Sequence, residues 1–146
     1  MIPVDRTPSE QTAAVAFEFD LAHTPEKVWR ALTDPSLLGE WLLPVVGFRL
    51  ELKAPFTYQA PPQPGWDGVV HCRMLEIEPP RRLKYAWLVA DMDTVVTFTL
   101  TPTPTGTRLD ILQSGFREDQ KRNWGGARYG WKMMGERLFS LLDKTN

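Results

Sequence analysis

The chain has 146 residues, with 17 Lys and Arg against 18 Asp and Glu. This length fits a single domain over residues 1–146, with poor order expected in the polar residues 1–13. The balanced charge gives no reason to expect a nucleic-acid partner, and a single cysteine excludes an intramolecular disulfide and a multi-cysteine metal site. No apolar run reaches the ~20 residues that span a bilayer, and no apolar signal region follows Met1, so we predict a cytoplasmic protein without membrane contact.

The first part of the chain predicts one strand followed by two short helices. Residues 15–21 place apolar side chains at every second position, as in a strand with one buried face. Thr24-Pro25 and Asp34-Pro35 each set a capping side chain before a proline that suits the first helical position. We therefore expect one helix to begin at residue 25, and a second to run from residue 35 to about residue 41.

The middle of the chain predicts consecutive β-hairpins. Mostly alternating apolar runs, separated by turn signals, predict strands at residues 48–52, 56–59, 69–77, 83–89, 95–100 and 108–113. In the third of these, Leu75 and Ile77 are out of phase with Cys72 and Met74, which indicates a β-bulge. Strands grouped in this way, with helices only after the first strand and at the end, indicate an antiparallel α+β fold.

The stretch from Trp124 to Leu142 predicts the longest helix. At 3.6 residues per turn, its apolar side chains share one stripe centred near Trp131, formed by Trp124, Ala127, Trp131, Met134, Leu138, Leu141 and Leu142. Gly125 and Gly126 predict the start of this helix or a kink, because glycine costs about 1 kcal/mol in a helix interior relative to alanine.

Two further features of this helix concern function. Gly135 falls on the buried side, where its missing side chain leaves room either for a ligand or for a large ring such as Trp87. Tyr129 and Met133 fall on the opposite side. They are either ordinary exposed apolar residues or part of a partner surface, for example in a homodimer.

Three motifs carry a family resemblance. The run His23-Thr-Pro-Glu-Lys-Val-Trp-Arg-Ala-Leu-Thr-Asp-Pro35, followed by Trp41, resembles the opening of START-like, helix-grip proteins. It is most similar to bacterial relatives of the activator of the ninety-kilodalton heat-shock protein ATPase. In that family, Glu76-Ile-Glu-Pro-Pro-Arg-Arg-Leu83 with Trp87 matches the central hairpin. The terminal helix is matched by Gly130-Trp131, Leu138 and Leu142.

The resemblance implies a helix-grip fold with a deep apolar cavity between sheet and helix. In such a fold a curved antiparallel sheet of about six strands wraps around the long C-terminal helix, and two short helices lie between the first and second strands. Many relatives carry paired glycines near the second strand, whereas this chain reads Glu51-Leu-Lys-Ala-Pro-Phe56. The resemblance does not extend to the additional, unrelated domain of the eukaryotic co-chaperone, so it does not imply co-chaperone function.

No established catalytic or metal-binding motif occurs in the sequence. We therefore predict no catalytic residue, no metal site and no cofactor. His23, at a strand-to-helix turn, is expected to cap rather than to act as a base. His71 and Cys72 are neighbours on a predicted strand and face opposite sides, so we expect Cys72 in the core and His71 towards solvent.

The residues expected to line the cavity are large and mostly aromatic: Trp41, Trp66, Met74, Trp87, Phe98, Phe116, Trp124, Trp131 and Met134. Either Tyr85 or Arg128 would orient a polar group of the ligand. Arg128 lies at the edge of the helix stripe, where a position at the rim is favoured over one inside the cavity.

Three functions follow from this sequence. The leading hypothesis is the binding of a small hydrophobic or amphipathic ligand in the cavity. The second is an enzyme of the cyclase or dehydratase type that uses the same cavity, which rests on fold analogy alone. The third is a protein-binding module linked to chaperones.

Overall fold

The computed structural model describes residues 4–7 and 13–145. These residues form strands, two short α-helices, one 3-10 helix and one long α-helix. In chain order the elements are β1 (Val4–Asp5), β2 (Ala14–Leu21), α1 (Pro25–Thr33), α2 (Pro35–Trp41), β3 (Val45–Val46), β4 (Pro55–Gln59), β5 (Val69–Glu78), β6 (Arg82–Val89), β7 (Met92–Thr103), β8 (Gly106–Ser114), the 3-10 helix η1 (Glu118–Gln120) and α3 (Lys121–Lys144).

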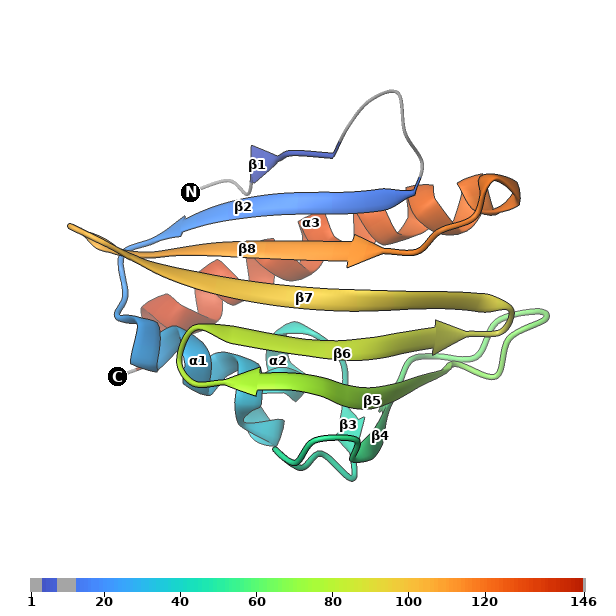
Figure 1. Ribbon diagram of the computed structural model, residues 1–146, viewed down its shortest axis with the longest axis horizontal. Helices are drawn as coiled ribbons and strands as arrows, with labels where there is room; N and C mark the ends of the chain where they lie inside the picture. Colours follow the sequence, from blue (N-terminus) through green and yellow to red (C-terminus); the bar gives the residue numbers. More distant parts are fainter. Residues whose placement is uncertain (1–3, 8–12, 146) are drawn as a thin grey trace.

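The described strands form one sheet that curves around α3. Their order is β1-β2-β8-β7-β6-β5-β4-β3, and every pairing is antiparallel. Figure 1 shows α3 crossing behind the sheet, with α1 and α2 at one end of it. The predicted α+β helix-grip fold is confirmed. The sheet has eight strands instead of about six, and two of them, β1 and β3, are only two residues long.

Both short helices begin at the predicted caps. The hydroxyl of Thr24 accepts a hydrogen bond from the backbone N–H of Lys27 at 3.2 Å. The carboxylate of Asp34 accepts one from the N–H of Ser36 at 2.9 Å. Each cap satisfies one of the amides that a helix start leaves without an intrahelical partner. These local contacts explain why the helix starts could be predicted from sequence.

The predicted strand at residues 48–52 is wrong. Leu50 and Leu52 are 42% and 64% exposed, and only Phe48 packs against the core, with its ring 5.1 Å from that of Phe56. The apolar alternation resembles that of a strand. No neighbouring strand pairs with these residues, however, and their backbone therefore follows a loop.

Positive backbone angles bound this loop. Gly47, which directly follows β3, has a φ of +75°, and Lys53 has a φ of +67°. The N–H of Lys53 donates to the carbonyl of Met74 at 2.8 Å and ties the loop to β5. Lys53 thus takes a conformation that glycine adopts freely, in the segment where the paired glycines of relatives are missing.

The bulge predicted in the strand at 69–77 is confirmed. The register between β5 and β6 shifts between Met74 and Glu76. Met74 is fully buried, and Leu75 is 43% exposed. The extra residue lets β5 bend around the core, which is the usual effect of a bulge.

The N-terminal segment adds an edge strand. Val4–Asp5 pairs with Phe17 and Glu18 of β2, and the carboxylate of Asp5 forms an ion pair with Arg128 of α3. The prediction of poor order for residues 1–13 otherwise falls on residues 1–3 and 8–12, which lie outside the described residues.

The predicted start of the long helix at Gly125 or Gly126 is wrong. α3 begins at Lys121, and both glycines lie inside it. Trp124 is therefore in the first turn, where its indole N–H donates to the carbonyl of Ala14 at 2.8 Å. This tertiary contact helps to hold a turn that two glycines alone would weaken by about 2 kcal/mol.

We call the region where α1 and α2 cover the C-terminal half of α3 the closed end. Its apolar side chains are 0–1% exposed, namely Leu32, Leu38, Trp41, Leu138 and Leu142. The indole N–H of Trp41 donates to the carbonyl of Ala31 at 2.8 Å, and the rings of Phe19 and Phe139 stack at 5.9 Å. This end is a packed core in which the buried indole N–H of Trp41 has a hydrogen-bond acceptor.

Candidate functional site

A cavity of about 410 Å³ lies between the N-terminal half of α3 and the sheet. We call it the Trp131 cavity, and the part of the molecule around it the open end. Its walls come from α3, from the ends of strands β5 to β8, from Leu43 in the connection between α2 and β3, and from the loop between β4 and β5. Figure 1 shows this last loop at the opposite end of the sheet from α1. The lining residues are Leu43, Gln63, Trp66, Val70, Trp87, Val89, Met92, Gln113, Arg122, Asn123, Gly126, Ala127, Gly130, Trp131 and Met134.

Three tryptophans form the apolar walls. Trp87 of β6 and Trp131 of α3 face each other with ring centroids 5.6 Å apart. Trp66 comes from the proline-rich loop, where its backbone exchanges two hydrogen bonds of 2.9 Å with that of Gln63. Its indole N–H donates to the carbonyl of Val69 at 3.1 Å. These bonds fix the ring of Trp66 over the cavity although its loop belongs to no strand.

A chain of buried hydrogen bonds holds the two facing rings. The indole N–H of Trp131 donates to the side-chain carbonyl of Gln113 at 2.8 Å. The amide nitrogen of Gln113 donates to the hydroxyl of Thr94 at 2.9 Å, and that hydroxyl donates to the carbonyl of Trp87 at 2.7 Å. Gln113 and Thr94 are each 1% exposed. The chain satisfies buried polar groups that would otherwise be costly, and it orients both walls.

Polar residues lie at the mouth of the cavity. Arg122 and Asn123 of the first turn of α3 and Gln63 of the facing loop are exposed and line the opening. Arg122 lies in a row with Gly126, Gly130 and Met134 at four-residue spacing, which places all four on one side of the helix. Our sequence prediction missed Arg122 because it placed the helix start four to five residues too late. Extending the four-residue spacing backwards from Met134 would have found it.

Comparison with protein families places the chain in one of them. The family model described as Activator of Hsp90 ATPase homolog 1-like protein matches residues 22–143. The chain belongs to this family. The match spans α1 through α3, so it includes every element that lines the Trp131 cavity. A comparison with functionally curated proteins gives no match.

Solved structures of other proteins share the fold. A protein from Mesorhizobium loti is 45% identical, with a TM-score of 0.83 over 91% of this chain and 98% of that one. A protein from Rhodobacter sphaeroides is 23% identical, with a TM-score of 0.75 over 97% and 99% of the two chains. DynU16, a protein in the dynemicin biosynthetic locus, is 21% identical, with a TM-score of 0.75 over 90% of this chain and 47% of that one.

Four of the residues that the sequence predicted to line a cavity lie on the walls of the Trp131 cavity. They are Trp66, Trp87, Trp131 and Met134. Five others lie away from it in the packed core, each 0–5% exposed: Trp41, Met74, Tyr85, Phe98 and Phe116. Alternation predicts which side chains face inward, but it does not say which inward side chains have a void beside them.

Two further predicted residues lie on another side of α3. The guanidinium of Arg128 stacks over the ring of Trp124 at 5.3 Å and pairs with Asp5. Burial opposes ionisation of Asp5, but hydrogen bonds from Thr7 and Arg128 outweigh it and lower the pKa of its carboxyl. Arg128 therefore anchors the N-terminal strand, in agreement with a position at the rim of the helix stripe.

Tyr85 belongs to an aromatic cluster behind the cavity wall. Its hydroxyl and that of Tyr58 share a hydrogen bond of 2.7 Å, and both residues are fully buried. Burial raises the pKa of both hydroxyls above the ordinary 10.0, and that of the Cys72 thiol above 9.0. All three groups are therefore neutral at physiological pH. Cys72 is buried in the core, as predicted.

Neither histidine contributes to the cavity. His23 donates through Nε2 to Asp143 at 3.1 Å and accepts through Nδ1 from Lys27 at 3.1 Å, so it ties α1 to the end of α3 instead of capping a helix. His71 is exposed on the outer face of β5. Among the described residues, no group of three or more His, Cys, Asp or Glu is placed to hold a metal ion.

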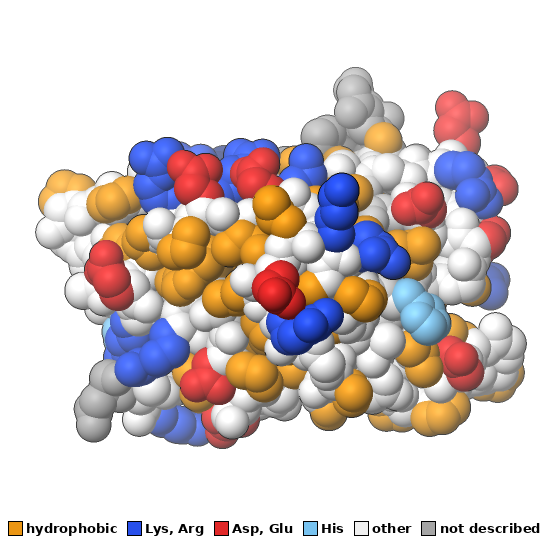
Figure 2. Space-filling model, turned by 60° about the horizontal axis from the view of Figure 1, so that its bottom comes forward, with side chains coloured by type: hydrophobic (Ala, Val, Ile, Leu, Met, Phe, Trp, Pro, Cys, Tyr) orange, Lys and Arg blue, Asp and Glu red, His pale blue; other side chains and the backbone are white. Residues whose placement is uncertain are grey.

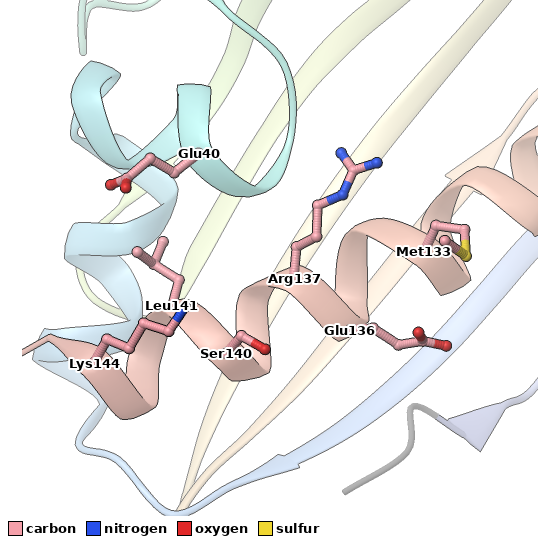
Figure 3. Close-up of a pocket in the computed structure, with 7 residues that line it drawn as sticks. All are labelled: Glu40, Met133, Glu136, Arg137, Ser140, Leu141 and Lys144. Carbon is pink, nitrogen blue, oxygen red and sulfur yellow. The ribbon is translucent and has the colours of Figure 1, made fainter.

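A second depression, of about 330 Å³, lies between α2 and the outer side of α3. Figure 3 shows Glu40 on α2 and the remaining lining residues on α3, namely Met133, Glu136, Arg137, Ser140, Leu141 and Lys144. Four of these seven side chains are charged, with both signs present. Such a lining suits a polar partner surface better than it suits an apolar small molecule.

The surface shown in Figure 2 is mixed in character. Hydrophobic side chains gather there among both basic and acidic ones, and no large area of this face carries a single sign of charge. A continuous basic surface, which nucleic-acid binding requires, is not seen on this face of the described chain. None of the described helices combines the length and apolar character that crossing a bilayer requires.

Proposed function

We propose that the protein binds a small apolar or amphipathic molecule in the Trp131 cavity. The observation that carries this proposal is the cavity itself, whose volume of about 410 Å³ lies in the range of ~300–1,000 Å³ typical of ligand pockets. Its walls are three tryptophans and two methionines with a small number of polar groups. Such a lining offers a large apolar contact area and few hydrogen-bonding groups that a ligand would have to match.

Catalysis in this cavity has less support than binding. Of the described residues that line it, Arg122 alone is ionisable, and an arginine stays protonated. General acid–base catalysis needs a group that exchanges a proton near neutral pH. The hydroxyl of Tyr85, which the cyclase hypothesis would use, is hydrogen-bonded to the hydroxyl of Tyr58 in the core. A protein-binding module linked to chaperones would need an exposed surface for its partner protein, and this cavity does not provide one.

Native mass spectrometry of the purified protein and titration of its tryptophan fluorescence test this proposal. We expect a co-purified small molecule, or a change in emission with lipids, aromatic compounds or polyketide-like compounds, because three tryptophans border the cavity. Ala127→Leu fills the cavity from α3 and should weaken binding by about tenfold or more. Lys132→Leu, at an exposed position of the same helix that lines neither the Trp131 cavity nor the second depression, is the matched control and should bind normally. If no compound binds, the proposal fails.

We also infer that the outer side of α3 packs against a second copy of this chain. Glu136 and Arg137 are both exposed and have no ion pair with any described residue. If two α3 helices pack antiparallel about a two-fold axis near these residues, Glu136 of each copy meets Arg137 of the second copy. Tyr129, 66% exposed, would then lie near Lys144 of the second copy, where a cation–π contact is available.

Native mass spectrometry at several protein concentrations measures this association. Glu136→Lys places like charges opposite each other and should shift the protein to monomers. The double variant Glu136→Lys with Arg137→Glu restores the complementarity with the signs exchanged, and it should restore dimers. If the wild type is monomeric at all concentrations, or if the double variant behaves like the single one, this inference is wrong.

A further inference from the structure

The polar groups of the Trp131 cavity are unevenly distributed. Gln113, deep in the cavity, already uses its carbonyl and its amide nitrogen in hydrogen bonds to Trp131 and Thr94. Arg122 and Asn123 lie at the opening and are exposed. A bound ligand therefore contacts mainly apolar walls inside the cavity and a cationic group at its mouth.

Arg122 has no carboxylate partner among the described residues. Its neighbour along the chain, Arg117, is held by Asp91 and Asp119 at 3.1 and 3.2 Å, and these contacts also occupy the two nearby acids. Asp67, on the facing loop, accepts a hydrogen bond from the N–H of Val69 at 3.0 Å. Glu118 is the remaining acid close by in sequence, while Lys121 adds a positive charge next to Arg122. The guanidinium of Arg122 is thus available to an external anion.

The surface of α3 forms a path from Arg122 into the cavity. Gly126 and Gly130 are the two residues between Arg122 and Met134 in the four-residue row. A Cβ at Gly126 would meet no atom within 4 Å, and one at Gly130 would meet the terminal methyl group of the flexible Met134 side chain at 3.3 Å. Along the helix axis, Arg122 and Trp131 are separated by nine residues, or about 13 Å. An elongated molecule can therefore lie along the helix with one end at Arg122 and the other between Trp131 and Trp87.

We infer that the ligand is an amphipathic carboxylate, with its apolar body along the glycines of α3 and its carboxylate on Arg122. This inference rests on the proposed function of the cavity. The planar guanidinium matches a carboxylate with two parallel hydrogen bonds. The apolar body displaces water from the walls formed by Trp87 and Trp131, and the charged end stays at the solvent boundary, where its desolvation is small.

A charged and a neutral probe with the same apolar chain test this inference. Dodecanoate and its methyl ester are titrated against the wild-type protein, with tryptophan fluorescence and calorimetry as readouts. We expect dodecanoate to bind about tenfold tighter than the ester, which is the scale of a charge-assisted hydrogen bond. Raising the salt concentration should reduce this difference, because the mouth is exposed to solvent.

Three arginine variants locate the effect. Arg122→Gln should weaken dodecanoate about tenfold and leave the ester within about twofold. Arg122→Lys should retain part of the preference, because lysine keeps the charge but lacks the planar fork. Arg49→Gln, at an exposed arginine in the loop before β4 that lines neither the Trp131 cavity nor the second depression, is the control and should change neither affinity.

The possible results separate this inference from the proposed function. Equal affinities for acid and ester, or a dodecanoate affinity that Arg122→Gln leaves unchanged, would overturn the carboxylate inference while the apolar cavity remains a binding site. If dodecanoate, the ester and the neutral aromatic compounds all fail to bind, the proposed function and this inference fall together. Equal losses in Arg122→Gln and Arg49→Gln would show a nonspecific charge effect and would also overturn the inference.

Discussion

The two ends of the interface between α3 and the sheet differ in what covers them. At the closed end, α1 and α2 pack over the C-terminal half of α3, and Trp41, Leu138 and Leu142 are 0–1% exposed. At the open end, the cover is the proline-rich loop between β4 and β5, which contributes Trp66 and Gln63. The same helix and the same sheet therefore yield a solid core at one end and a cavity of about 410 Å³ at the other.

This difference shows that the cover decides where a cavity forms. A helix presents a row of side chains at regular spacing and interdigitates with its neighbours, whereas a loop rich in proline holds fewer side chains over the same area. The inward aromatic residues are as large at the open end as at the closed end. What the open end lacks is a second helix, and Gly126 and Gly130 remove further volume from α3.

The largest expected effect compares one tryptophan from each end. Trp41→Ala should destabilise the protein at the upper part of the ~3–5 kcal/mol range for such truncations, because packed atoms surround the ring on all sides. Trp131→Ala should lie at the lower part, because one side of its ring already faces the cavity and has fewer contacts to lose. Unfolding in denaturant measures both. Equal losses, with ligand binding intact in Trp131→Ala, would contradict the distinction between the ends.

The next effect concerns the aromatic cluster behind the cavity wall. Tyr85→Phe leaves the buried hydroxyl of Tyr58 without its partner and should cost about 1–3 kcal/mol. Replacing both tyrosines by phenylalanine removes both hydroxyls and should cost less than either single change. The three variants form a double-mutant cycle, measured as free energies of unfolding. Additive losses would show that the 2.7 Å contact carries no coupling.

Alkaline pH should weaken the fold through the same cluster. Burial raises the folded-state pKa of Tyr58, Tyr85 and Cys72 above the ordinary 10.0 and 9.0. Their stabilising contribution is therefore complete below about pH 9 and declines as the pH rises from there towards the folded values. Each titrating group adds up to ~1.4 kcal/mol per pH unit. The double Tyr→Phe variant should show a shallower decline between pH 9 and 11; an unchanged slope would contradict the assignment.

The smallest effect compares two adjacent glycines of α3. Neither Gly125 nor Gly126 has an atom within 4 Å of an added Cβ, so alanine at either position should stabilise the helix by roughly 0.5–1 kcal/mol. Only Gly126 lines the cavity, and Gly126→Ala should therefore also narrow its mouth and slow ligand binding. Thermal unfolding and stopped-flow fluorescence measure the two effects. The same binding rate in both variants would mean that ligands enter elsewhere.

Much of the fold could be predicted from sequence, because the signals are local. Thr24 and Asp34 cap helices through contacts within three residues, and alternation along β6 reports one buried face. Local signals failed where pairing partners decide, as at residues 48–52, which alternate but pair with no strand. They failed again at the start of α3, where a hydrogen bond from Trp124 to Ala14, far away in sequence, holds a turn next to two glycines.

The site was predictable only in part. By itself, the sequence determined the family, the fold class and the set of large inward side chains, because these depend on motif order and on the periods of strand and helix. Only the tertiary structure decided that Trp66, Trp87, Trp131 and Met134 border a cavity while Trp41 and Phe98 fill the core. It also placed Arg122 at the mouth and Arg128 elsewhere. The physical reason is that periodicity tells which way a side chain points, while a void depends on what packs against it from distant parts of the chain.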